Sequence, residues 1–176
     1  MADHTGDGQI TVLALSGGGP FGPFGAGVLA GWTQTGQRPE ADVVTGVSAG
    51  SLLSTYAFLG PAYDEAEREI YASITTQGVY KKRELIEVPF SSSLVKQKPL
   101  RLLMEVMMSD DVLDRVATQR RERGRCLLVA LTDLDNGRVV VWDLTSIAAS
   151  NRSDRRELYV DALIASSAIP GFFQPV

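Results

Sequence analysis

Short apolar runs alternate along the chain with stretches whose apolar residues recur every three or four positions. The runs have the length and β-branched content of strands, and they cover residues 10–16, 43–47, 126–132 and 139–142. The helical spacing occurs at residues 26–33, 51–59, 64–75, 100–108, 112–123 and 158–166. This order predicts an α/β fold. Because residues 10–16 are nearly all apolar, we expect a strand buried on both faces of a parallel sheet.

Local turn signals indicate where some of these elements begin and end. Asn136-Gly137 separates the last two apolar runs and predicts a β-hairpin. Ser109 is a predicted N-cap for the helix over residues 112–123. Five arginines between residues 115 and 125 gather near the end of that helix, and we interpret them as a solvated cluster.

A serine flanked by two glycines joins the second apolar run to the helix that follows it. Gly46 and Gly50 stand two residues before and after Ser48. Glycine lacks the Cβ atoms that would collide at a sharp strand-to-helix turn, so the hydroxyl is lifted clear of the sheet beside a helix N-terminus. We predict that Ser48 is a nucleophile for acyl transfer. The alternative is a turn that uses small residues only for packing.

A glycine-rich turn follows the first apolar run. Gly17, Gly19 and Gly22 satisfy Gly-x-Gly-x-x-Gly, the dinucleotide-binding pattern. That pattern requires an acid after the next strand, whereas Asp42 precedes it. The backbone N–H groups of Gly17, Gly18 and Gly19 could instead stabilise an oxyanion. Two consecutive strand-to-helix turns lie at the same edge of a parallel sheet, so amide donors and the serine would meet there.

Composition limits the possible partners and ligands. The chain has 176 residues, 44% of them hydrophobic, with a net charge of −4 and a pI near 5.0, so we expect one domain and no nucleic-acid partner. Cys126 is the only cysteine and His4 the only histidine, so we expect no disulfide, metal or cofactor. No signal peptide or apolar span of about 20 residues is present. We predict a soluble, cytoplasmic protein with a disordered leader at residues 1–8.

Residues 78–99 read as a long irregular connection that carries basic residues beside Phe90 and Leu94. Long loops in compact domains are often lids or binding loops. The segment could make transient contact with an anionic lipid surface, or it could be an exposed insertion without a partner.

A serine hydroxyl needs a base to take its proton, and histidine is the usual one. His4 lies in the acidic, glycine-rich leader. A Ser-His-Asp triad is therefore not expected, and the remaining candidates for the base are a carboxylate and a lysine.

Three segments together resemble successive sequence blocks of the patatin-like phospholipases. They are residues 15–27 with the triple glycine, residues 45–50 around Ser48, and Ala165-Ser166-Ser167-Ala168-Ile169-Pro170-Gly171-Phe172-Phe173. The resemblance implies a three-layer α/β/α fold over residues 9–176, with a mostly parallel central sheet. It also implies a lipid acyl hydrolase with a Ser-Asp dyad, in which Ser48 is the nucleophile and Gly17, Gly18 and Gly19 supply the oxyanion hole. The generic hydrolase rule would add the Ala49 amide.

The chain departs from the family pattern at two places. The family commonly has an arginine where this chain has Phe21. The family's dyad aspartate follows the Pro-Gly-Phe-Phe block, but the sequence stops at Val176, and Asp133, Asp135, Asp143 and Asp161 do not fit that position. We therefore expect the aspartate to come from beyond Val176, in a following segment or a second chain. The rival functions are a non-catalytic lipid-binding or regulatory module of the same fold, and nucleotide binding at residues 17–22.

Overall fold

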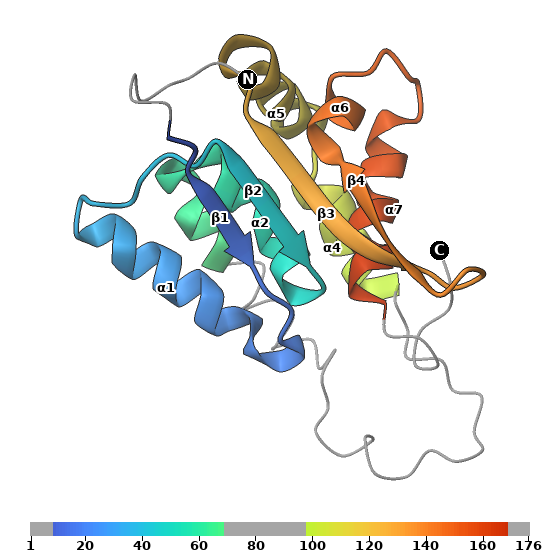
Figure 1. Ribbon diagram of the computed structural model, residues 1–176, viewed down its shortest axis with the longest axis horizontal. Coiled ribbons are helices and arrows are strands. Elements are labelled where there is room, and N and C mark those ends of the chain that lie inside the picture. Colours follow the sequence, from blue (N-terminus) through green and yellow to red (C-terminus); the bar gives the residue numbers. More distant parts are fainter. Residues whose placement is uncertain (1–8, 69–97, 169–176) are drawn as a thin grey trace, which may run out of the picture.

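The computed structural model describes residues 9–68 and 98–168 (Figure 1). The elements along these residues, with two short 3-10 turns (η), are β1 (Val12–Leu15), η1 (Gly19–Phe21), α1 (Gly22–Gln34), β2 (Val43–Val47), α2 (Ala49–Leu59), η2 (Pro61–Tyr63), α4 (Lys98–Met107), α5 (Asp110–Arg123), β3 (Cys126–Asp133), β4 (Arg138–Asp143), α6 (Leu144–Ala148) and α7 (Arg155–Ser167).

The four strands form one sheet in the order β1-β2-β3-β4. The first three strands are parallel, and β4 pairs antiparallel with β3 through the predicted hairpin. Leu15 pairs with Gly46, and Val47 pairs with Ala130. The turns that follow β1 and β2 therefore leave the sheet at the same edge.

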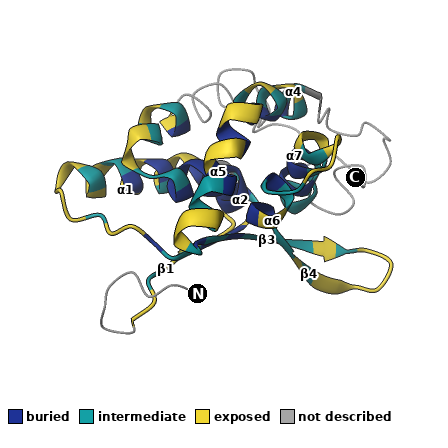
Figure 2. Cartoon of the chain, turned by 90° about the horizontal axis from the view of Figure 1, so that it is seen from above, coloured by how far each residue is buried: buried dark blue, intermediate teal, exposed yellow. Residues whose placement is uncertain are grey.

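The described helices gather on one face of this sheet (Figure 2). The connections from β1 to β2 and from β2 to β3 run in the same direction across the sheet, and right-handed crossovers then place their helices on the same side. Helix α2 lies in the middle of this layer, and every residue from Ala49 to Phe58 is buried. The predicted α/β class is confirmed. The arrangement agrees with a three-layer α/β/α fold of which the described residues supply the sheet and one helical layer.

Burial on both faces of the sheet is not found in the described residues. Along β1 the side chains alternate between half-buried and exposed, and Val12 is 57% exposed. On β4, Val139 is 72% exposed. The apolar composition of residues 10–16 was therefore a poor guide to burial, since only Leu13 and Leu15 pack against the core.

The helix ends agree in part with the sequence signals. The Ser109 hydroxyl accepts a hydrogen bond from the Val112 amide, as predicted, and Gly124 ends α5 in a left-handed conformation. Helix α1 begins at Gly22, earlier than the predicted residue 26, because a proline is compatible with the first helical turn. The arginine cluster is not uniformly solvated, because Arg125 is buried.

Candidate active site at the end of β2

Ser48 connects β2 to α2 in a conformation that side chains rarely adopt. Its φ of 53° is the one positive φ at a non-glycine position in residues 9–68 and 98–168. Such a conformation costs on the order of 1–3 kcal/mol and persists only where the surrounding structure enforces it. The predicted order of strand, sharp turn and helix is therefore confirmed around Ser48.

Gly46 and Gly50 are needed because backbone lies directly against them. A Cβ at Gly46 would lie 2.8 Å from the Gly50 carbonyl oxygen, and a Cβ at Gly50 would overlap the Leu15 carbonyl. Real Cβ atoms do not approach backbone so closely, and backbone cannot swing aside as a side chain can. The two glycines thus let the first turn of α2 fold back onto the ends of β1 and β2.

The glycine turn after β1 lies against the serine. A Cβ at Gly17 would lie 3.2 Å from Ser48 Cβ and 3.8 Å from Ser48 Oγ. Gly19 has a φ of 49°, which favours glycine, and the Phe21 amide donates to the Gly18 carbonyl at 3.0 Å. The structure therefore brings Gly17 and Ser48 together from two separate turns, as we predicted from two consecutive turns at one edge of a parallel sheet.

The backbone of Ser48 is held on both sides. Its N–H donates to Ser166 Oγ at 3.0 Å, and its carbonyl accepts from both the amide (2.9 Å) and the hydroxyl (2.7 Å) of Ser51. Sequence reasoning included Ser166 in a family block but gave it no role. No local signal could have found it, because 118 residues separate the bonded groups.

The N-terminus of α2 contributes to the electrostatic environment of Ser48. Ser48 immediately precedes α2, whose N-terminus carries partial positive charge and favours an anion. Within the described residues, no hydrogen bond joins Ser48 Oγ to another side chain.

Three of the four aspartates considered from the sequence have side chains bonded to other groups. Asp161 pairs with Arg101, Asp143 pairs with Arg120, and Asp133 accepts from the side chain and backbone of Asn136. The hydrogen bond from the Asn136 side chain lowers the pKa of Asp133. Asp135 lies exposed in the same hairpin turn. Within residues 9–68 and 98–168, none of these four aspartates is hydrogen-bonded to Ser48.

Phe21 bears on one departure from the family pattern, and Asp42 bears on the dinucleotide-binding alternative. Phe21, at the position where the family commonly has arginine, is 76% exposed. The Asp42 carboxylate accepts from the Thr11 amide at 2.8 Å, at the start of β1 and β2. Since the glycine turn follows the other end of β1, Asp42 is not placed to bind a ribose beside it.

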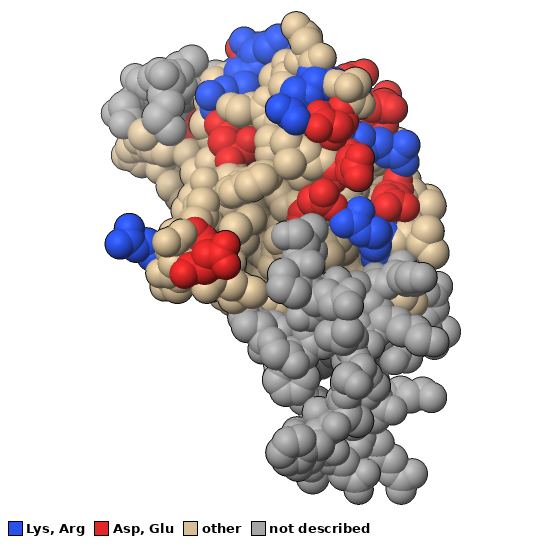
Figure 3. All heavy atoms as spheres, turned by 90° about the vertical axis from the view of Figure 1, so that its right-hand side faces the viewer, with Lys and Arg blue, Asp and Glu red and all other residues tan. Residues whose placement is uncertain are grey.

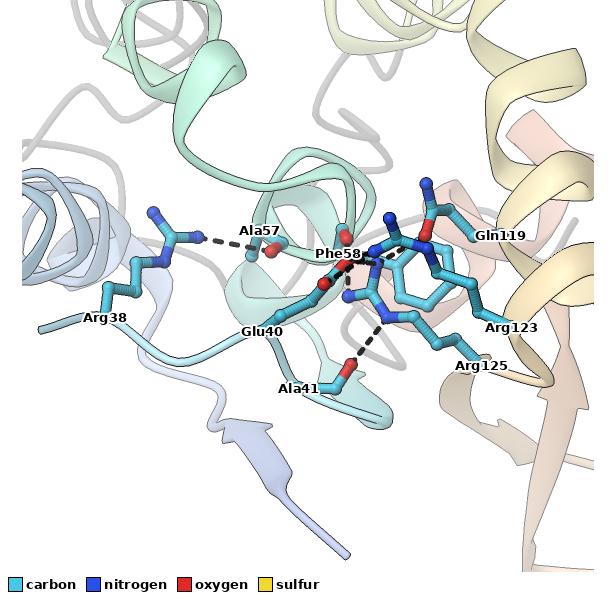
Figure 4. Close-up of polar contacts among 8 residues, drawn as sticks. All are labelled: Arg38, Glu40, Ala41, Ala57, Phe58, Gln119, Arg123 and Arg125. Atoms are coloured by element: carbon cyan, nitrogen blue, oxygen red, sulfur yellow. Dashed lines mark hydrogen bonds and ion pairs between the residues drawn. The ribbon is translucent and has the colours of Figure 1, made fainter. Parts of the chain in front are cut away.

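A hollow of about 270 Å³ lies at the opposite end of α2 from Ser48. Arg38 donates to the Ala57 carbonyl at 3.2 Å, and Arg125 donates to the Phe58 carbonyl at 2.8 Å (Figure 4). Arg125 also stacks over the Phe58 ring at 4.4 Å. The two guanidinium groups thus satisfy carbonyls at the C-terminal end of α2, where cations are favoured.

Several sequence predictions fall outside the described residues. These are the leader at residues 1–8, nearly all of the segment 78–99, and the Ile169 to Phe173 part of the third family block. In the parts of the chain that are described, no group of three His, Cys, Asp or Glu side chains could hold a metal ion. None of the described helices is long and apolar enough to cross a membrane.

Comparison with known proteins gives a family. Residues 13–176 match the family model described as Patatin-like phospholipase. No curated protein matches the chain. The matched region includes the sheet, both glycine-containing turns and α7. The chain therefore belongs to the patatin-like phospholipase family, and its function is that of a lipid acyl hydrolase.

Proposed function

We propose that the chain hydrolyses the ester bond of a lipid through an acyl-enzyme intermediate on Ser48, with an aspartate as its base. The observation that carries the proposal is the meeting of Gly17 and Ser48, because a nucleophile and oxyanion donors must lie within a few ångströms of one reacting carbonyl.

The chemistry proceeds in two steps. Ser48 Oγ attacks the ester carbonyl carbon while the aspartate carboxylate takes the hydroxyl proton, and N–H groups of Gly17, Gly18 and Gly19 stabilise the oxyanion. Collapse of the tetrahedral intermediate breaks the ester C–O bond, and the leaving alcohol takes the proton. Water then attacks the acyl-Ser48 ester, its proton passes through the same carboxylate to Ser48, and the fatty acid leaves.

We further propose that the aspartate comes from beyond Val176, in a following segment or a second chain. The support is that Asp133, Asp143 and Asp161 are each bonded to another group, and that the family resemblance places the aspartate after the Pro-Gly-Phe-Phe block. Rapid ester hydrolysis by a purified polypeptide whose intact mass equals that of these 176 residues would contradict this part of the proposal.

A fluorophosphonate probe tests the nucleophile, because it forms a covalent bond only with an activated serine. We expect labelling of the protein and complete loss of labelling in Ser48→Ala, with the labelled peptide containing Ser48. Equal labelling of both proteins would contradict the role of Ser48.

Lipid contact through residues 78–99 belongs to the same proposal and would appear as sedimentation with anionic vesicles.

The second candidate is a non-catalytic lipid-binding module. It is favoured by Phe21, which replaces a basic residue near the oxyanion turn and is solvent-exposed. This candidate predicts binding to lipid vesicles without probe labelling at Ser48, even when the aspartate-bearing segment is present.

A further inference from the structure

Ser166, in the last turn of α7, bridges β2 and β3 at the point where the pairing of these two strands stops. Its hydroxyl accepts from the Ser48 N–H at 3.0 Å and donates to the Ala130 carbonyl at 2.6 Å. Ala130 is the partner of Val47, the last residue of β2 in the ladder. The Ser166 hydroxyl therefore continues the connection between β2 and β3 at the residue where β2 turns away.

A second hydrogen bond joins α7 to α2, at the same distance along each helix from the contact between Ser48 and Ser166. Thr55 on α2 and Tyr159 on α7 share a hydrogen bond of 2.9 Å between buried hydroxyls. Burial raises the pKa of Tyr159, which keeps that hydroxyl protonated. Thr55 lies seven residues after Ser48, and Tyr159 lies seven residues before Ser166. The two contacts are therefore about 10 Å apart along α2 and about 10 Å apart along α7. Two contacts at equal spacing fix both the rotation and the sliding of α7 against α2.

The bond to Ser166 also limits which amides can stabilise an oxyanion. A backbone N–H that donates along one direction to Ser166 Oγ is not directed at a substrate carbonyl. While this bond is kept, the Ser48 amide does not contribute to the oxyanion hole. The adjacent glycine turn lies against Ser48. Its N–H groups must then supply more of the stabilisation of the negative charge in the transition state.

We propose that Ser166 is a positioning residue that holds Ser48 in its strained conformation with its hydroxyl presented to the substrate. The inference rests on the proposed function of Ser48. Loss of the Ser166 hydroxyl leaves the Ser48 amide without this partner and frees the turn to relax from its φ of 53°. A shift of about 1 Å in a nucleophile can lower a rate on the order of 100-fold.

The chain supplies a closely matched control. Ser167, the next residue, donates its hydroxyl to the Ile164 carbonyl of its own helix at 2.9 Å. Ser167→Ala removes the same group from the same turn of α7 without affecting Ser48. Ser166→Thr keeps a hydroxyl, and Ser166→Val has nearly the volume of threonine without it.

The test measures fluorophosphonate labelling rate, kcat and KM for a short-chain nitrophenyl ester, and the thermal midpoint, in the protein that includes its aspartate-bearing segment. For Ser166→Ala we expect kcat and labelling rate to fall roughly 10- to 100-fold while KM changes less than about threefold. Ser167→Ala keeps wild-type rates, and Ser166→Thr is much faster than Ser166→Val. Hydrogen exchange at the Ser48 amide is expected to be roughly tenfold faster in Ser166→Ala, since one hydrogen bond is lost.

Different failures have different signatures. Wild-type rates and unchanged Ser48 amide exchange in Ser166→Ala would overturn the positioning role. Equal slowing in Ser166→Thr and Ser166→Val would overturn it as well, because the effect would then come from packing. If the wild-type protein is not labelled at Ser48, the proposed function fails, whereas faster Ser48 amide exchange in Ser166→Ala would still establish the bond that holds the turn.

Discussion

Gly50 lies where the first turn of α2 touches the end of β1, and the space for a side chain is filled by backbone. A Cβ there would overlap the Leu15 carbonyl and lie 2.7 Å from the Ser16 carbonyl oxygen. Because neither carbonyl can move without displacing its strand, Gly50→Ala is expected to lower the free energy of unfolding by at least about 3 kcal/mol. Urea unfolding followed by circular dichroism measures this change.

Gly31 is a matched control for this substitution. It lies inside α1, and a Cβ there would have no neighbour within 4 Å. Gly31→Ala is expected to raise the free energy of unfolding by up to about 1 kcal/mol, since alanine favours helix more than glycine. Equal stability of Gly50→Ala and Gly31→Ala would show that the close approach at Gly50 is not present in solution.

Glu67 is a buried acid, and neither of its carboxylate oxygens has a hydrogen-bond partner within residues 9–68 and 98–168. Burial raises its pKa to about 8, although nearby Arg38 lowers it. Between the ordinary glutamate pKa of 4.5 and pH 8 the folded protein keeps a proton that the unfolded chain releases, so the free energy of unfolding is expected to fall as the pH rises through that window. Above pH 8 the dependence on this group should level off.

Glu67→Gln tests whether Glu67 causes this pH dependence, because glutamine keeps the shape of a protonated glutamate and does not ionise. We expect the variant to lose this contribution to the pH dependence between pH 5 and pH 8 and to be more stable than wild type at pH 8. Thermal midpoints at several pH values measure both effects. A wild-type midpoint that stays constant across the window would contradict the raised pKa.

Helix α2 is held at its far end by a buried arginine from the start of β3. The Arg125 side chain is 3% exposed, and it donates to the carbonyls of Ala41 and Phe58. Arg125→Met leaves both carbonyls without this partner, so we expect a loss of about 2–4 kcal/mol in the free energy of unfolding. The Arg123 side chain is 48% exposed, and Arg123→Met is expected to cost less than about 1 kcal/mol.

The two arginine variants are compared by urea unfolding with the same probe. Burial lowers the pKa of Arg125, which identifies it as a charge removed from water, and such a charge must be compensated by its partners. If both variants lose the same small amount of stability, the buried contacts of Arg125 do not hold the end of α2.

Elements whose cause lies in neighbouring residues were predictable from the sequence. The hairpin follows from Asn136-Gly137, the start of α5 from Ser109, and β2 has the predicted bounds of 43–47. Features that depend on residues distant in the sequence could not be predicted from it. The burial of Arg125 depends on Phe58 and Ala41, which are 67 and 84 residues away. The candidate site divides in the same way, since the glycines signal the turn at Ser48 while the hydrogen bond from the Ser48 N–H to Ser166 has no local signature.

Charges of both signs lie on the surface that α5, α6 and α7 present. Figure 3 shows Lys and Arg mixed with Asp and Glu on this face. Arg155 lies near both Asp110 and Asp114, and Arg152 pairs with Asp154. Pairs of this kind contribute little to stability individually, so the cohesion of the fold depends on its apolar core.

That core is one continuous cluster, which predicts cooperative unfolding. The buried cluster includes Ala26 of α1 and Ile164 of α7, and Trp142 of β4 packs against it. Strands β1 and β4 are the two edges of the sheet, and Figure 1 shows α1 beside β1. Trp32 on α1 and Trp142 on β4 therefore report from opposite sides of the fold.

Single-tryptophan variants test whether both sides unfold together. In Trp142→Phe the fluorescence reports on α1 through Trp32, and in Trp32→Phe it reports on the edge strand β4 through Trp142. We expect each fluorescence transition in urea to coincide with the loss of helical circular dichroism in the same variant, because a shared core gives neither side an independent stability. If Trp32 fluorescence changes at a lower urea concentration than the helical signal of the same variant, α1 and the glycine turn form a separate, weaker unit. The serine would then be more stably held than the amides proposed to stabilise its oxyanion.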